Sequence, residues 1–280
     1  MNDEAPPTEK MMDRSQGMNV RTMRIEQYEL TSYIEHFSEH NQAVVHDALL
    51  DERGRLAKAA KIQAVLTDFS AEPLANLACL DVGCSTGHIT NALAGDFHGI
   101  VGIDTDQKAL VVAEGREAAG RFQRGSALSL PYRSGVFDVV LCNHVYEHVS
   151  DQQTLFDEIW RVLRPDGFCY LAAGNRLKVI EPHYRLPFLS WLPRPIAHRY
   201  LRLTGRGRFY FEHHLTCRSL RRLVSRFEVR DYTLTILRDP RRFGANDPLL
   251  ARLPSKGLPL ALLRLAYFAL PTYIWILQKP

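Results

Sequence analysis

Short, almost continuous apolar runs alternate with helical segments between about residues 78 and 174. The runs LACLDV, GIVGID, GVFDVVLCN and GFCYLAAG predict strands, while DQKALVVAEGREAAG and the segment that follows Ser150 predict helices. Strands that are apolar along their whole length are typical of a parallel sheet with helices on both faces. We therefore predict an α/β fold built on a doubly wound, mainly parallel sheet.

The remainder of the chain predicts further segments around this sheet. Residues 1–25 are polar and predict a disordered tail, residues 26–76 predict an N-terminal helical segment, and residues 77–280 predict the main domain. Two insertions are expected within it, at 175–215 and 238–270. The apolar segment 257–278 contains Arg264 and Pro271, so it predicts a buried helix at about 259–269 and a strand at about 272–278 rather than a membrane span.

Charge and cysteine content narrow the class of protein. The formal net charge of +4 over 280 residues is small, so we expect no DNA partner. The five cysteines are scattered and never in C-x-x-C spacing, which indicates reduced thiols in a cytoplasmic protein. Nothing in the sequence indicates an oligomeric state.

The turn in LDVGCSTGHIT, residues 80–90, predicts the position of a bound ligand. Its small residues join a strand to a helix, and Asp104 closes the next strand 21 residues after Gly83, the spacing at which a carboxylate binds ribose hydroxyls. Asp81 lies two residues before Gly83, where its charge would repel a pyrophosphate. The same charge suits S-adenosylmethionine (SAM), which carries an ammonium and a sulfonium.

Four blocks of sequence resemble the class I SAM-dependent methyltransferases, in particular the small-molecule type. They are LDVGCSTGHIT, VGIDTD, GSALSLPYRSGVFDVVLCNHVYEHVSD and RVLRPDGFCYLAAGN, and they cover about residues 80–175 in order. The resemblance implies a Rossmann-like methyltransferase fold with a seven-stranded sheet and SAM as cofactor. It assigns cofactor binding to Asp81, Gly83, Cys84, Gly87, Asp104, Thr105, Ser126, Ala127 and Asn143.

The roles implied by this resemblance differ along the edge of the sheet. Gly83 and Gly87 line the methionine side with Asp81, Asp104 binds the ribose, Ser126 and Ala127 lie by the adenine, and Asn143 lies beside the methyl group. Two positions depart from the family pattern. Ser85 stands where a third glycine is frequent, and Ser126 stands where an Asp usually accepts from the adenine amino group, which a hydroxyl does more weakly.

The EHV loop after the fourth strand resembles that of small-molecule O-methyltransferases, which implies O-methylation of a small or amphiphilic acceptor. A hydroxyl acceptor must lose a proton, and His148 and His144 are the catalytic candidates, with His148 preferred as general base. A structural role for His148 is an equal alternative. Glu147 and His148 are adjacent and make a poor ligand pair, so we expect no metal site. A non-catalytic SAM-binding protein is a further alternative.

The insertion 175–215 predicts a lid on the acceptor side of the cofactor. It is rich in Pro, Arg and aromatic residues, and Tyr184, Arg185, Trp191 and Tyr210 are the expected substrate-binding residues. Three acceptors remain open: an amphiphilic small molecule, a lipid-linked glycan or lipid, or an RNA or protein. The second would bring the cytoplasmic protein to the inner face of the membrane as a weak peripheral contact.

Overall fold

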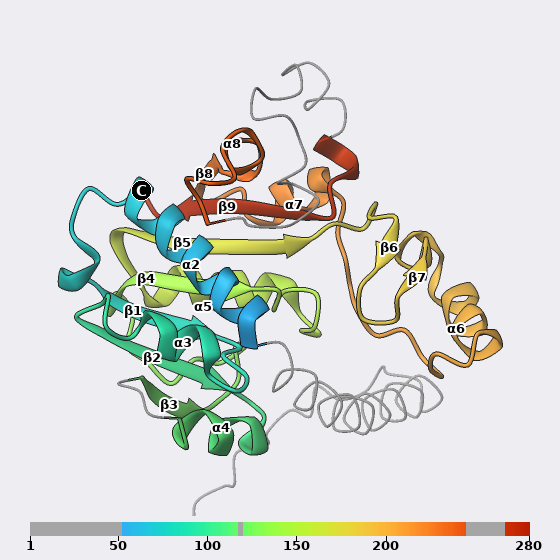
Figure 1. Ribbon diagram of the computed structural model, residues 1–280, viewed down its shortest axis with the longest axis horizontal. Coiled ribbons are helices and arrows are strands. Elements are labelled where there is room, and N and C mark those ends of the chain that lie inside the picture. The colour runs from blue at the N-terminus through green and yellow to red at the C-terminus, as the bar shows by residue number, and fades with distance from the viewer. Residues whose placement is uncertain (1–51, 117–119, 245–266) are drawn as a thin grey trace, which may run out of the picture. The chain divides into compact units, whose positions relative to one another are not determined.

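The computed structural model of the protein describes residues 52–116, 120–244 and 267–280. Its main feature is a seven-stranded sheet of order β3-β2-β1-β4-β5-β9-β8, in which β9 alone runs antiparallel to its neighbours (Figure 1). The predicted seven-stranded, mainly parallel α/β sheet is confirmed. The strands are β1 Ala78–Val82, β2 Gly99–Asp104, β3 Arg121–Arg124, β4 Phe137–Asn143, β5 Leu163–Gly174, β8 Glu228–Asp231 and β9 Thr272–Gln278.

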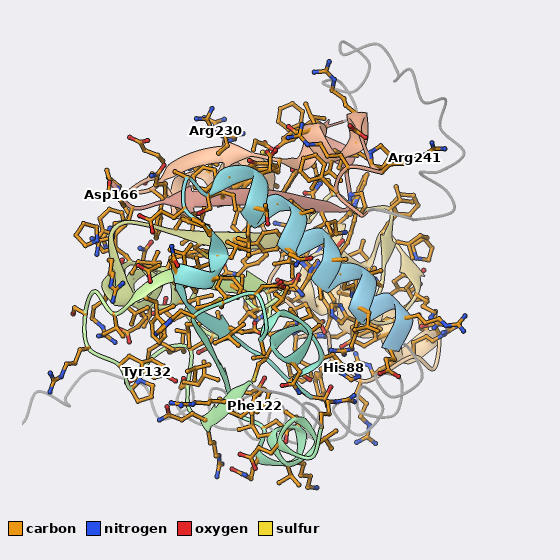
Figure 2. The ribbon with its side chains drawn as sticks, turned by 60° about the vertical axis from the view of Figure 1, so that its left-hand side comes forward. His88, Phe122, Tyr132, Asp166, Arg230 and Arg241 are labelled. Carbon is orange, nitrogen blue, oxygen red and sulfur yellow. The ribbon has the colours of Figure 1, made fainter. Side chains whose placement is uncertain are left out.

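Helices cover both faces of this sheet. They are α2 Glu52–Phe69, α3 His88–Leu93, α4 Gln107–Glu114, α5 Gln152–Val162, α7 Cys217–Leu223 and α8 Thr233–Arg238, whereas α6 Arg194–Leu203 belongs to the insertion 175–215. Figure 2 shows α2 lying across one face, between Phe122 on the edge strand β3 and Arg230 on the opposite edge strand β8. Short 3₁₀ turns lie at η1 Leu74–Asn76, η2 Leu189–Trp191 and η3 Tyr267–Ala269.

The side chains of β4, which point alternately to the two faces of the sheet, show why the apolar runs are continuous. Val140 and Cys142 pack into a core with α5 and α7, whereas Val139 and Leu141 pack into a second core with α2 and α8. All four side chains are fully buried, because each face of the strand meets a covering layer. The N-terminal helical segment therefore contributes to the core of the main domain through the part that is described.

Two elements differ in detail from the sequence prediction. The cap of α5 is Asp151, whose side chain accepts from Thr154 N at 3.1 Å, so the helix begins at Gln152, one residue later than the start predicted directly after Ser150. The segment FEVRDYTLTIL, expected as one strand, divides into β8 and the helix α8. The backbone turns at Tyr232, and Thr233 N donates to Asp231 Oδ1 at 2.9 Å.

The C-terminal strand is confirmed at the predicted residues. β9 lies between β5 and β8, and its Trp275 is fully buried. The helix expected at 259–269 falls mostly outside the described residues, as do the tail at 1–25 and most of the insertion at 238–270. No helix in the described parts of the chain is long and apolar enough to cross a membrane.

The insertion 175–215 leaves and rejoins the sheet at one point. Asn175 and Leu215 form a parallel bridge, and Arg176 N donates to Leu215 O at 3.0 Å. Between them lie a hairpin of β6 Ile180–Glu181 and β7 Leu186–Pro187, the turn η2 and the helix α6. Figure 1 shows this unit beyond the carboxyl end of β5. It has a small core of its own, formed by Tyr184, Leu186, Leu189, Ala197, Leu201 and Tyr210.

Candidate active site

The turn after β1 is shaped by backbone positions that favour glycine. Gly83 and Gly87 both have φ +70°, and a Cβ on Gly83 would lie 2.6 Å from Val145 Cγ2. Ser85 has φ +50°, which explains why glycine is frequent at this position in the resembling family. Cys84 packs its side chain under Gly102 of β2, so only its backbone is left to line the turn.

The side chain of Asp104 links this turn to the end of β2 through hydrogen bonds from the backbone. Its Oδ2 accepts from Ser85 N at 2.8 Å, and its Oδ1 accepts from Asp106 N at 2.9 Å. Burial raises the pKa of the Asp104 carboxyl, while these backbone donors lower it. The carboxylate thus lies at the carboxyl edge of the sheet, beside the glycine turn, as the spacing predicted.

Asp81 is buried beneath the same turn. Its Oδ2 accepts from Thr90 Oγ1 at 2.6 Å, and only 3% of the residue is exposed. Burial raises the pKa of Asp81 to about 7, and the charge of Asp104 raises it further, against the lowering effect of Thr90. A cationic group bound near the turn would stabilise the charged form of Asp81. The buried carboxylate of Asp81 therefore fits a ligand that carries an ammonium.

The remaining cofactor-site residues lie at the ends of neighbouring strands. Asn143 ends β4 and is half-buried, and Thr105 is exposed directly after β2. Ser126 and Ala127 follow β3, and the Ser126 hydroxyl accepts from Leu128 N at 3.1 Å. Parallel strands β2, β1 and β4 are neighbours, so these residues share one edge with the glycine turn.

The loop after β4 contains a histidine–glutamate pair. His144 Nδ1 lies 3.0 Å from Glu147 Oε1, and the two side chains are 36% and 1% exposed. Hydrogen bonding and the charge of His144 lower the pKa of Glu147 to about 2 despite its burial. His144 adopts φ +58° and its N donates to Ala172 O at 2.9 Å, a strained conformation of the kind found at functional sites.

His148 lies deeper in the same loop. Burial lowers its pKa to about 3, so the imidazole is neutral at pH 7. A group with so low a pKa is a weak general base, since the best bases titrate near the working pH. Of the two predicted catalytic histidines, His144 is the one whose side chain is partly exposed and paired with a buried carboxylate.

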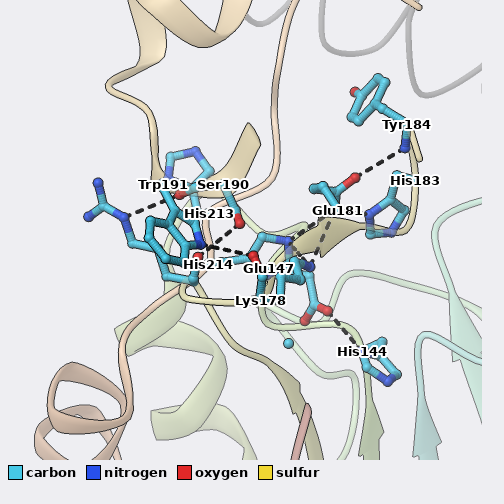
Figure 3. A network of polar contacts seen from close by, with 12 residues as sticks. His144, Glu147, Lys178, Glu181, His183, Tyr184, Ser190, Trp191, His213 and His214 are labelled. Atoms are coloured by element: carbon cyan, nitrogen blue, oxygen red, sulfur yellow. Dashed lines mark hydrogen bonds and ion pairs between the residues drawn. The ribbon is translucent and has the colours of Figure 1, made fainter. Parts of the chain in front are cut away.

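The lid adds a buried polar network to this edge, shown in Figure 3. Lys178 Nζ lies 2.7 Å from His214 Nε2 and 3.3 Å from Glu181 Oε1, and Glu181 Oε1 lies 2.7 Å from His183 Nδ1. A Cβ on Gly174, at the end of β5, would lie 2.9 Å from the His214 ring. The network therefore meets the carboxyl edge of the sheet.

The four predicted substrate-binding residues do not share one surface. Tyr184 and Tyr210 are each 4% exposed, with ring centroids 5.8 Å apart, and they form part of the lid core. Arg185 is exposed at the turn between β6 and β7. Trp191 is 44% exposed and its Nε1 donates to Lys178 O at 2.8 Å, so it joins the lid surface to the buried network.

Sequence reasoning missed the network itself. Lys178, Glu181, Glu212 and His214 lie in a segment without periodicity, and their burial could not be read from the pattern. A signal was present, since FEHHLT places an acidic residue beside two histidines.

Comparisons with known proteins agree with this geometry. Residues 80–171 match the family model described as a methyltransferase domain. An uncharacterized methyltransferase of Mycobacterium sp. (strain JLS) is 38% identical over 93 residues, which are 33% of this chain and 37% of that protein. A ubiquinone biosynthesis O-methyltransferase of Rhizobium rhizogenes is 31% identical over 141 residues, 48% of this chain and 56% of that protein.

Solved structures extend the likeness to the fold of the whole chain. The plantazolicin methyltransferase BpumL, solved with a monoazolic desmethylPZN analog and SAH, has a TM-score of 0.57 at 15% identity, covering 94% of this chain and all of that one. The chain spans about a third to a little over half the length of the curated relatives it matches. Residues 80–171 match a methyltransferase domain, which confirms the predicted resemblance to the SAM-dependent methyltransferases, and the seven-stranded fold agrees with it.

Proposed function

We propose that the protein transfers a methyl group from SAM to a hydroxyl group of a small or amphiphilic acceptor. The observation that carries the proposal is the meeting of the glycine turn, Asp81, Asp104 and Asn143 at one edge of a methyltransferase sheet. When bound there, SAM supplies an electrophilic methyl group. The chain's own tasks are alignment, exclusion of water and removal of the acceptor proton.

The residues fit the cofactor at each part of the edge. Gly83 has a φ of +70° and no space for a Cβ beside Val145, so the tight turn requires glycine there, and Asp81 offers a buried carboxylate to an ammonium. Asp104 already accepts two backbone hydrogen bonds, which fix its carboxylate for ribose hydroxyls. Adenine lies, in this proposal, by Ser126 and Ala127.

O-methylation is supported by the pair of His144 and Glu147. The imidazole of His144 is partly exposed, so its Nε2 can accept a proton from an acceptor hydroxyl. Glu147 is bound to Nδ1, orients the ring and stabilises the imidazolium that forms, as the carboxylate does in a catalytic triad. The relative from Rhizobium rhizogenes is an O-methyltransferase by name, and we infer the same reaction class here.

SAM binding tests the cofactor assignment directly. Asp104→Asn removes the charge that faces the ribose and should weaken SAM binding by about 1.5–3 kcal/mol, the usual contribution of a hydrogen bond to a charged group. The matched control is Asp138→Asn. Asp138 accepts from Ala78 N at 2.8 Å and pairs with Arg164 at the amino ends of the strands. Equal SAM affinity of the two variants in calorimetry would refute the assignment.

The base is tested by turnover of a hydroxyl acceptor that yields S-adenosylhomocysteine. His144→Gln should lower turnover by about 10²–10⁴-fold with SAM affinity unchanged. An unchanged rate in His144→Gln would exclude the proposed pair.

A lipid-linked acceptor is a second candidate, favoured by the lid surface. Among the described residues, most large exposed apolar side chains lie in the insertion, which also carries seven arginines. Apolar and basic side chains together suit an anionic lipid interface. Flotation of the protein with phosphatidylglycerol vesicles, but not with neutral ones, would support this acceptor. The exposed apolar set in the lid is Val179, Ile180, Phe188, Trp191, Ile196 and Leu203.

A further inference from the structure

Three side chains from three separate segments meet beside the histidine–glutamate pair. His148 comes from the loop after β4, His183 from the loop between β6 and β7, and Glu212 from the segment that returns the lid to α7. One possible ligand atom of each lies within 4.8 Å of the others. We propose that His148, His183 and Glu212 bind one divalent transition-metal ion of the Zn²⁺ type.

The donor set selects the class of metal. Two imidazole nitrogens and one carboxylate are a ligand set of open zinc sites, in which a fourth position is left for water or substrate. Mg²⁺ and Ca²⁺ prefer oxygen ligands and are disfavoured by two imidazoles. Bonds of about 2.0–2.2 Å require the ligand atoms to approach one another by roughly 1 Å, within reach of side-chain rotation.

Glu181 orients His183 for such a role. Its Oε1 lies 2.7 Å from His183 Nδ1, and Glu181 is fully buried. A carboxylate bound to one imidazole nitrogen directs the other nitrogen toward a metal and fixes the ring, as outer partners of metal-binding histidines do. His183 can then present Nε2 to the ion.

The charge of the buried network also favours a cation. Glu147, Glu181 and Glu212 are at most 6% exposed, and Lys178 is the buried lysine or arginine among the described residues. Glu212 Oε2 is buried without a hydrogen-bond partner within the described parts of the chain. Burying an excess of carboxylates is costly unless a cation compensates it. A divalent ion at Glu212 would supply both the charge and the missing contact.

A second trio, Glu181, His183 and His214, is also close enough to bind an ion. The Lys178 ammonium lies 3.3 Å from Glu181 Oε1 and 2.7 Å from His214 Nε2, so a cation already contacts two of its members. Adding a metal ion there would oppose that charge. We therefore assign the ion to His148, His183 and Glu212.

The consequence of this site, though not the site itself, rests on the proposed function. His148 lies on the same loop as Asn143 and His144, so the open position of the ion would lie on the acceptor side. A hydroxyl that binds a divalent ion loses its proton more readily. The ion would then hold the acceptor oxygen while His144 accepts its proton.

Cobalt binding tests the site without any need for activity. The full chain, freed of metal by chelator dialysis, is titrated with Co²⁺ and followed by visible absorption, with Zn²⁺ competition and metal analysis. We expect one ion per chain with the intense visible bands of a four- or five-coordinate site. His148→Gln and Glu212→Gln should each weaken Co²⁺ binding by at least about 100-fold, beyond the usual effect of losing an outer partner.

Two controls separate the possible outcomes. His98→Ala removes an exposed histidine and should leave Co²⁺ binding unchanged. His214→Asn removes a member of the second trio alone and should keep the site. Loss of binding in His214→Asn with retention in His148→Gln would overturn the assigned ligands, as would no Co²⁺ binding by the folded wild-type chain. Calorimetry of SAM binding to the same samples distinguishes two failures. A chain that binds SAM but no Co²⁺ lacks this metal site, whereas a chain that does not bind SAM contradicts the proposed function.

Discussion

The proposed contact between Asp81 and the ammonium of SAM predicts that SAM binding depends on pH. The carboxyl is buried, is bound by Thr90 and has a pKa raised to about 7, so it is mostly protonated at mildly acid pH. An ammonium bound beside it requires the charged form. SAM affinity should therefore rise with pH as Asp81 loses its proton.

The pKa sets the size of this effect. The charged fraction of Asp81 is about 3% at about pH 5.5 and about one half at about pH 7.0, so SAM should bind roughly fifteenfold more tightly at the higher pH. In this range the amino group of SAM keeps its proton, since α-amino groups titrate at about 7.7–8.0. Near pH 7, binding should release about half a proton per SAM.

Calorimetry in two buffers with different ionisation enthalpies measures both the affinity and the released proton. Asp81→Asn is the matched variant, because it keeps the shape and an acceptor for Thr90 but cannot ionise. Its SAM affinity should be lower at pH 7 and flat across the range. A wild-type affinity that is constant over this range, or the same slope in both proteins, would refute the role of Asp81.

Three further perturbations test the packing around the site. Gly174→Ala places a Cβ 2.9 Å from the His214 ring and should lower the free energy of unfolding by about 1–3 kcal/mol in denaturant titrations, whereas Gly99→Ala, with open space around it, should not. Trp191→Ala should raise the KM of the acceptor with little change for SAM, and the opposite pattern in steady-state kinetics would place Trp191 in the cofactor site. Deletion of 271–280 removes β9 from between two strands, so circular dichroism should show an unfolded protein, and a cooperatively folded truncation would contradict that placement.

Periodicity predicted the central sheet because burial on both faces leaves a direct mark on the sequence. β1, β2, β4 and residues 168–174 of β5 are apolar at nearly every position, and the glycine turn and Asp104 lie at strand ends that follow from those runs. The carboxyl ends of adjacent parallel strands share one edge, so the cofactor site could be placed from order and spacing alone.

The helix α8 shows where local preference fails. TLTIL is rich in β-branched residues, which favour strands, and it follows β8 without a glycine or proline. In the structure Tyr232 N donates to Ile274 O at 2.9 Å, and the turn then directs Ile236 into the core beneath α2. Tertiary packing decides the conformation, and that packing depends on residues far along the chain.

The proposed metal site could not be found from sequence spacing. His148, His183 and Glu212 are 35 and 29 residues apart, and each comes from a segment without helical or strand periodicity. Their meeting depends on the closure of the lid at Asn175 and Leu215. In the sequence, Glu147 and His148 are adjacent and make a poor ligand pair. In the structure the lid supplies the other two proposed ligands, His183 and Glu212.

The lid and the catalytic loop form one structural unit rather than a cover and a separate site. Tyr146 OH donates to Gly174 O at 2.5 Å and accepts from Leu215 N at 3.0 Å, so one hydroxyl joins the loop, β5 and the end of the lid. His213 N donates to Glu147 O at 2.7 Å, which ties the lid to the residue that orients His144. Any shift of the lid must therefore displace the proposed base. In the proposed mechanism these contacts couple acceptor recognition by the lid to proton removal by His144, so an acceptor that fits the lid poorly should be methylated slowly even when it binds.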